Sequence, residues 1–143
     1  MYATTHFIIG ATAGLITQDP VVAFLGGCAS HALADMVPHH DYQETKWGVL
    51  DVAAAVAIGF LLVSLGYGVS VLAGGIGGMS PDIEVVWAHF HPEDYLPPNP
   101  RRRLLFPSHS GLLPHGKLDF PWGFILQLGM VAALLTLFVK EAS

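Results

Sequence analysis

Long apolar stretches, interrupted by short polar breaks, dominate the chain. Residues 6–37 are largely apolar around a break at Asp19-Pro20, residues 52–81 carry no charge, and residues 120–139 form another uncharged stretch. A helix needs about 20 apolar residues to cross a bilayer. The pattern therefore predicts an all-α, membrane-embedded chain, with a soluble all-α domain of unusually apolar helices as the alternative.

Turn residues divide these stretches into a predicted bundle of about five helices. We expect the helices at about 5–17, 20–37, 48–66, 69–90 (broken near 79–81) and 120–140.

The predicted breaks have local causes. Asp19 is suited to cap the second helix, with Pro20 as its first residue, and Gly66-Tyr67-Gly68 predicts a helical hairpin. Ser80 is expected to cap a helix that restarts at Pro81. The proline-rich segment 91–119 predicts one long loop, and the length of 143 residues predicts a single domain over 1–143.

Composition narrows the possible functions. Only six Lys and Arg stand against eleven Asp and Glu, so we expect no nucleic-acid partner. The single cysteine, Cys28, excludes an intramolecular disulfide and a multi-cysteine zinc site. Eight histidines in an apolar chain instead suggest metal or proton chemistry near a membrane.

Threading the predicted helices up and down places the polar segments at one end. The N-terminus, the 38–47 loop and the 91–119 loop share this end, which the positive-inside rule makes cytoplasmic. The basic residues there are Lys46, Arg101, Arg102, Arg103 and Lys117. All eight histidines fall toward the same end, which predicts a single polar site.

The strongest motif is Ser30-His31-Ala32-Leu33-Ala34-Asp35. His31 and Asp35, four residues apart, share one helix face and could bind one divalent ion or bridge two. A hydrogen bond within the helix is the alternative. His39 and its neighbour His40 follow directly and could ligate a metal or form a solvated helix end.

Further candidates lie at the other predicted helix ends. Asp82 is a possible metal ligand, and both it and Glu84 could instead simply stabilise a helix N-terminus. His109, between two serines, indicates a presented ligand or general acid/base, or else a surface histidine. His6 could point into the end of the bundle.

Two further features carry open alternatives. Asp51, before thirty uncharged residues, is either a functional intramembrane carboxylate or an interfacial charge. The run Arg101-Arg102-Arg103 could bind a substrate phosphate or anchor the chain on anionic lipid.

Together these motifs resemble a family of small bacterial inner-membrane proteins described as metal-dependent hydrolases. The family carries an N-terminal His, a P-D-[IL]-D element, a T-H-S element and S-H-x-x-x-D. The matches here are His6, Pro81-Asp82-Ile83-Glu84, Ser108-His109-Ser110, and Ser30-His31 with Asp35.

The match has departures. The S-H-x-x-x-D element comes first here, whereas family members place it last, and Glu84 replaces the second acid of P-D-x-D. A looser similarity links the chain to the all-α, zinc-dependent phospholipase C and nuclease enzymes, whose helical H-x-x-x-D builds a multi-metal site.

The resulting prediction is a metal-dependent hydrolase, acting on a small-molecule or lipid phosphoester at a bacterial inner membrane. The predicted ligands of one or two Zn²⁺ or Mn²⁺ ions are His6, His31, Asp35, Asp82 and His109. The candidates for general base are Glu84, His39 and Asp51. The alternatives are a metal-ion or proton transporter and a non-catalytic membrane protein with a structural metal.

Overall fold

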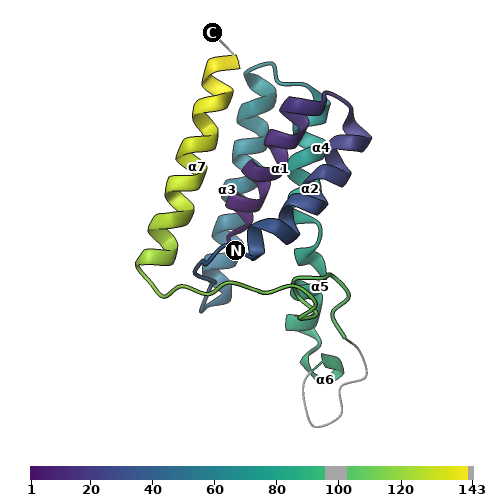
Figure 1. Ribbon diagram of the computed structural model, residues 1–143, viewed down its shortest axis with the longest axis vertical. Coiled ribbons are helices and arrows are strands. Elements are labelled where there is room, and N and C mark those ends of the chain that lie inside the picture. The colour runs from purple at the N-terminus through teal and green to yellow at the C-terminus, as the bar shows by residue number, and fades with distance from the viewer. Residues whose placement is uncertain (96–102, 142–143) are drawn as a thin grey trace.

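The protein is all-helical in a computed structural model that describes residues 1–95 and 103–141 (Figure 1). The helices are α1 (Ala3–Thr17), α2 (Pro20–Asp35), α3 (Thr45–Ser64), α4 (Val69–Met79), α5 (Asp82–Phe90), α6 (Pro92–Tyr95) and α7 (Trp122–Glu141). The predicted all-α class is confirmed. The described ranges contain seven helices rather than about five, because the expected 69–90 helix divides into α4 and α5 and α6 lies inside the expected loop. Arg101 and Arg102 fall outside the described residues.

The predicted start of α2 and the predicted turn between α3 and α4 are confirmed, whereas α2 ends at Asp35 rather than at residue 37. The Asp19 carboxylate accepts hydrogen bonds from the backbone of Val21 and Val22, and Pro20 is the first residue of α2. Gly66 adopts a φ of 88° in the α3–α4 turn, a conformation that favours glycine. The expected cap by Ser80 is wrong, because this residue keeps helical backbone angles and its hydroxyl donates to the Gly77 carbonyl.

Helices α1, α2 and α4 pack with their backbones in close approach. A Cβ atom on Gly74 of α4 would overlap the Gly10 carbonyl of α1, and one on Gly78 would overlap the His6 carbonyl. A Cβ on Gly27 of α2 would overlap the Gly74 carbonyl. Small residues thus bring the three helices together. This close packing sets the positions of the side chains at the lower end of the helices in Figure 1.

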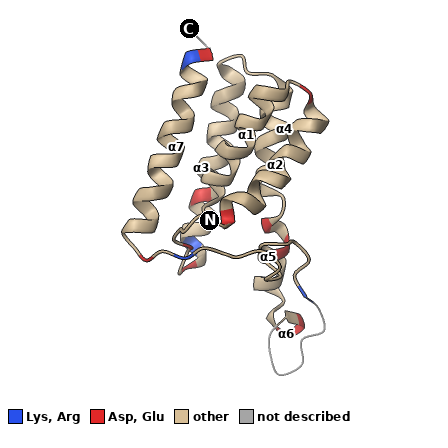
Figure 2. Cartoon of the chain, viewed as in Figure 1, with Lys and Arg blue, Asp and Glu red and all other residues tan. Residues whose placement is uncertain are grey.

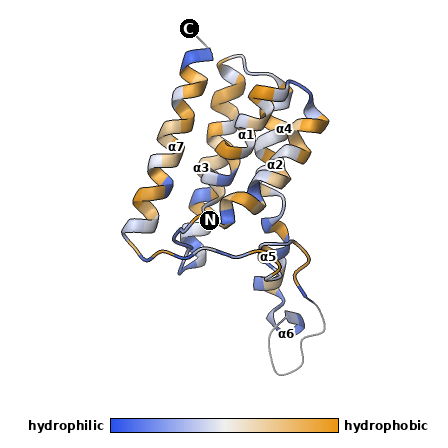
Figure 3. Cartoon of the chain, viewed as in Figure 1, coloured by the Kyte–Doolittle hydropathy of each residue, from blue (hydrophilic) through white to orange (hydrophobic). Residues whose placement is uncertain are grey.

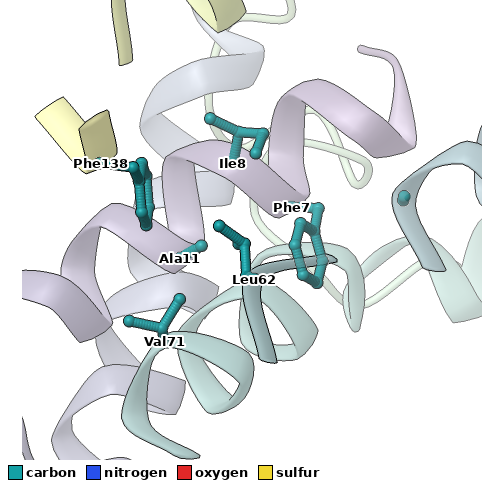
Figure 4. Close-up of a cluster of buried hydrophobic side chains, with 7 residues drawn as sticks. Phe7, Ile8, Ala11, Leu62, Val71 and Phe138 are labelled. Atoms are coloured by element: carbon teal, nitrogen blue, oxygen red, sulfur yellow. The ribbon is translucent and has the colours of Figure 1, made fainter. Parts of the chain in front are cut away.

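A small apolar core joins α3 and α7 to this trio (Figure 4). Phe7 and Ile8 of α1 lie in it with Leu62 of α3, Val71 of α4 and Phe138 of α7. The core ties the outer helices to α1 through a few side chains. Its side chains are apolar, so the core stabilises the fold and supplies no ligand to the site.

The outer helices present apolar side chains to their surroundings. Helices α3 and α7 are both long and apolar enough to cross a membrane. In each of them, only 17% of an apolar stretch of 18 residues is buried inside the protein. Figure 3 colours most residues of these two helices as hydrophobic. Apolar surface on this scale is uncommon on soluble monomers and marks interaction sites. These two helices are consistent with membrane association.

Charged residues gather at the opposite end from the C-terminus (Figure 2). Among the charged residues of the described ranges, only Asp19, Lys140 and Glu141 lie near the end of the bundle that carries the C-terminus. The polar end contains the N-terminus, the α2–α3 connection, α5, α6 and the segment before α7 (Figure 1).

Candidate metal centre

The polar end of the bundle brings together the five residues predicted as metal ligands. They are His6 on α1, His31 and Asp35 on α2, Asp82 at the start of α5, and His109 in the segment before α7. The first three are buried and the other two half-buried. Ligand atoms of His31, Asp35 and His109 lie within 4.8 Å of one another, and so do those of His6, His31 and Asp82. These groups could hold a metal ion.

Three of the residues have the spacing expected around one tetrahedral ion, and Asp82 lies beside two of them. His31 Nε2 lies 3.2 Å from His109 Nε2 and 3.2 Å from Asp35 Oδ2, and His109 Nε2 lies 3.4 Å from Asp35 Oδ2. Asp82 Oδ1 is 3.6 Å and 3.5 Å from the two imidazole nitrogens. Ligands bound to zinc at ordinary lengths stand about 3.3 Å apart along a tetrahedral edge. The side chains therefore need little rearrangement to surround an ion.

Hydrogen bonds on the outer sides of two rings aim their Nε2 atoms inward. His31 Nδ1 lies 2.6 Å from the Gly78 carbonyl, and His109 Nδ1 lies 2.9 Å from Glu84 Oε1. Because these oxygens accept, each Nδ1 carries a hydrogen, and each ring in its neutral form presents a lone pair at Nε2. Two such lone pairs cannot hydrogen-bond to each other, so a cation or an additional proton between them is favourable.

The loop that carries His109 is fixed by two carboxylates. Glu84 accepts hydrogen bonds from the backbone nitrogens at 105–106, at 2.7 Å and 2.9 Å. The Ser108 hydroxyl donates to Asp35 Oδ2 at 2.7 Å. Glu84, a candidate general base in the sequence, is thus placed as the partner that orients His109. Such outer carboxylates fix ring orientation at metal sites.

Buried polar atoms near the centre have no hydrogen-bond partner within the described ranges. They are both ring nitrogens of His6 and Oδ1 of Asp35. His6 Nε2 lies 3.2 Å from Asp35 Oδ1, and its ring stacks on His31 with the centroids 3.7 Å apart. Since unpaired buried polar atoms are costly, an added cation would stabilise this arrangement.

A second group of imidazoles and carboxylates lies beside the first. His39 Nε2 is 3.1 Å from His115 Nε2 and 3.1 Å from Asp41 Oδ1, and His115 Nε2 is 3.5 Å from Asp41 Oδ2. Ligand atoms of Asp35, His39 and His115 lie within 4.8 Å of one another. The Met1 nitrogen lies 2.9 Å from Asp41 Oδ1 and 3.6 Å from Asp35 Oδ1. The space between these carboxylates therefore accommodates a positive group.

The sequence prediction named His39 as a candidate base and left Asp41 and His115 out of the ligand set. The two histidines meet because residues 116–118 pair with the end of α2 and the segment after it. The Gly116 nitrogen donates to the Asp35 carbonyl, and the nitrogen of residue 118 donates to the His39 carbonyl. The sequence Pro38-His39-His40-Asp41 indicates possible metal ligands, but the pairing of His39 with His115 depends on the tertiary fold.

Asp51, the remaining candidate base, lies apart from these groups. Its carboxylate accepts hydrogen bonds from the Thr4 backbone and the Tyr42 hydroxyl, so it ties α1, the α2–α3 connection and α3 together. His40 also faces away and contacts the Tyr2 hydroxyl at 3.0 Å. The structure thus brings the five predicted ligands together and places Asp51 outside them.

The charges at the site favour a cation. Burial would raise the pKa of Asp41, but the neighbouring His39 ring and the charged Met1 amino group hold it well below its usual range. Burial lowers the pKa of His115, which keeps this imidazole neutral and able to ligate. Burial of His109 opposes its charge, but hydrogen bonds to Asp35 and Glu84 outweigh it and raise the pKa of this ring. The carboxylates therefore attract positive charge into the centre.

Comparison with known proteins gives no family for this chain. No protein-family model, no curated protein and no solved structure matches it. The functional argument therefore depends on the residues of the centre and their surroundings.

Proposed function

We propose that the protein is a metal-dependent hydrolase, acting on a phosphoester at a membrane surface. The observation that carries the proposal is the convergence of His31, Asp35 and His109, whose ligand atoms lie 3.2–3.4 Å apart, with Asp82 Oδ1 at 3.5–3.6 Å from both imidazole nitrogens. A mixed set of imidazole and carboxylate ligands suits Zn²⁺ or Mn²⁺. A divalent ion bound there would activate a water molecule and stabilise the oxyanion charge that develops during hydrolysis.

The residues of the chain supply the remaining requirements. Glu84 and the Gly78 carbonyl hold the outer nitrogens of two ligand rings, so the inner nitrogens are aimed before an ion binds. Asp82 is 30% exposed, whereas Asp35 is 1% exposed. The centre therefore opens toward solvent on the Asp82 side, where a substrate can approach. An open side is the arrangement expected of a catalytic rather than a closed structural site.

An apolar groove beside Asp82 supports a lipid as the carrier of the phosphoester. The groove has a volume of about 570 Å³ and extends from Asp82 between α3 and α4, past Val56, Phe60 and Leu72. Ser80 and Asp82 are the polar residues of its lining. Since α3 is one of the two helices able to cross a membrane, an acyl chain in this groove would place its polar headgroup at the metal centre.

We further propose a location in the bacterial inner membrane, with the N-terminus and the proline-rich segment on the cytoplasmic side. The outer faces of α3 and α7 would contact lipid, and the charged end would lie at the cytoplasmic surface.

Metal content and phosphodiesterase activity test the proposal. Detergent-purified protein is analysed by mass spectrometry for bound metals, beside His31→Ala and the control His91→Ala on the surface beyond α5. We expect zinc or manganese in the wild type and the control, and its loss from His31→Ala. The metal-loaded protein is then assayed on bis-p-nitrophenyl phosphate and on a phosphatidylcholine in mixed micelles, where the lipid should be preferred. Absence of metal under zinc and manganese supply, or absence of hydrolysis of both substrates, would contradict the proposal.

A further inference from the structure

We infer that the centre holds two divalent ions, the second bound by His39, Asp41 and His115 and joined to the first by the Asp35 carboxylate. The inference deepens the proposed function and rests on it for the first ion position. It also gives His39 a different role from the general base that the sequence suggests.

The second group has the spacing of a ligand set. Its three separations among His39 Nε2, His115 Nε2 and the Asp41 oxygens are 3.1 Å, 3.1 Å and 3.5 Å. Each value lies near the edge of about 3.3 Å expected around a tetrahedral zinc ion. The two Asp41 contacts use different oxygens of its carboxylate, Oδ1 for His39 and Oδ2 for His115. A set of two imidazoles and one carboxylate also leaves room for a further ligand.

His39 is oriented for ligation in the same way as His31. Its Nδ1 lies 2.7 Å from the Val37 carbonyl, so Nδ1 carries the hydrogen and Nε2 faces the group as a lone pair. The side chain is 1% exposed, and the ring is therefore held in one orientation. A buried imidazole that points its lone pair at two possible ligands is a preorganised metal donor.

Asp35 lies between the two groups, and its carboxylate is close to ligand atoms of both. Oδ2 lies 3.2 Å from His31 Nε2 and 3.4 Å from His109 Nε2, in the first group. Oδ1 is buried without a hydrogen-bond partner among the described residues. The nearest positive group to Oδ1 on the side of the second group is the Met1 nitrogen, which also contacts Asp41. His6 Nε2 also lies 3.2 Å from Oδ1, and His115 Nδ1 lies 3.9 Å from Oδ2. A carboxylate that bridges two ions would give each of these buried oxygens a cation.

Two ions joined by a carboxylate form a site suited to phosphoesters. In such pairs the two positive charges stabilise both the attacking and the leaving oxygen of a displacement at phosphorus. The second group therefore points to a phosphoester as the substrate class more strongly than a single ion does.

Metal stoichiometry tests the inference separately from catalysis. Metal-free protein in detergent is titrated with Zn²⁺ and, in parallel, with Mn²⁺, and bound ions per chain are counted after removal of free metal. We expect two ions in the wild type, one in His115→Ala and one in Asp41→Ala. The control His91→Ala should bind two, because this half-buried histidine contacts Trp87 rather than either group. His115 and Asp41 are partly exposed, so both variants should fold, and helical circular dichroism checks this.

The outcomes separate the two proposals. Two ions in the wild type with one lost in His115→Ala supports the paired site, even if no substrate is hydrolysed. One ion in the wild type, retained in His115→Ala and Asp41→Ala, overturns the second ion and leaves the first in place. Electron paramagnetic resonance of the manganese form gives a second readout: two bridged Mn²⁺ ions are magnetically coupled, and His115→Ala should restore the spectrum of an isolated ion.

Discussion

The α1–α2–α4 trio and the outer helices α3 and α7 are stabilised in different ways. In the trio, glycine surfaces bring backbones into contact, and a Cβ atom at Gly74 or Gly78 would overlap a neighbouring carbonyl. On α7, a Cβ at Gly129 would meet no atom within 4 Å. The trio is therefore shaped by contacts within the protein, whereas the outer helices leave most of their apolar surface for other contacts.

This difference explains where the candidate centre lies. Gly78 takes part both in helix packing and in orienting a ligand. Its lack of a side chain lets the His6 carbonyl approach, and its own carbonyl accepts the hydrogen bond from His31 Nδ1. The packing of three helices thus determines the geometry of the ligands at their end. Helices that fit loosely could not hold buried rings 3.7 Å apart in one orientation.

The largest expected effect on stability comes from adding one methyl group to a glycine of the trio and, for comparison, to a glycine of α7. Gly78→Ala should destabilise the fold by about 3 kcal/mol, because the new Cβ would overlap a backbone carbonyl that cannot move freely. Gly129→Ala should stabilise it by about 0.5–1 kcal/mol, because alanine favours a helix and the site is open. Denaturant unfolding in detergent measures both. Equal stability of the two variants would show that the glycine packing of the trio is not essential.

A charge on the outer surface tests what α7 contacts. Leu128 is 57% exposed near the middle of α7, and Leu128→Lys should cost about 2.5–3.5 kcal/mol if that face lies in lipid. The control Leu112→Lys lies in the segment before α7 and should have little effect. The measurement is the fraction of protein that stays in the membrane after alkaline extraction. Unchanged retention of Leu128→Lys would show that this face does not contact the bilayer core.

The sequence predicted those features that depend on nearby residues. The all-α class, the Asp19 cap and the Gly66 turn each follow from a few neighbouring positions, and the structure confirms them. The pairing of His31 with Asp35 follows from their spacing on one helix, and their side chains lie 3.2 Å apart. Gathering the polar side chains at one end follows from helix direction alone.

What the sequence missed depends on tertiary contacts. His39 and His115 are separated by 76 residues, and only the docking of the segment before α7 brings them together. The Ser80 cap failed for a similar reason, since α4 extends its helical backbone through that residue before α5 begins. No local pattern shows that Glu84 would bind His109 while Asp51 would bind Thr4 and Tyr42.

The smallest expected effects come from substituting two carboxylates: Glu84, which contacts a ligand ring, and Asp51, which lies outside the metal centre. Glu84→Gln replaces a charged acceptor for His109 Nδ1, so metal affinity should fall about 10- to 100-fold with little change in the fold. Asp51→Asn should leave metal affinity unchanged and lower stability by about 1 kcal/mol, because its hydrogen bonds join helices outside the centre. Zinc titration and denaturant unfolding, applied to both variants, separate the two effects. If Asp51→Asn weakened zinc binding as much as Glu84→Gln, the centre would extend further toward α3 than the ligand geometry indicates, and Asp51 would return as a functional carboxylate.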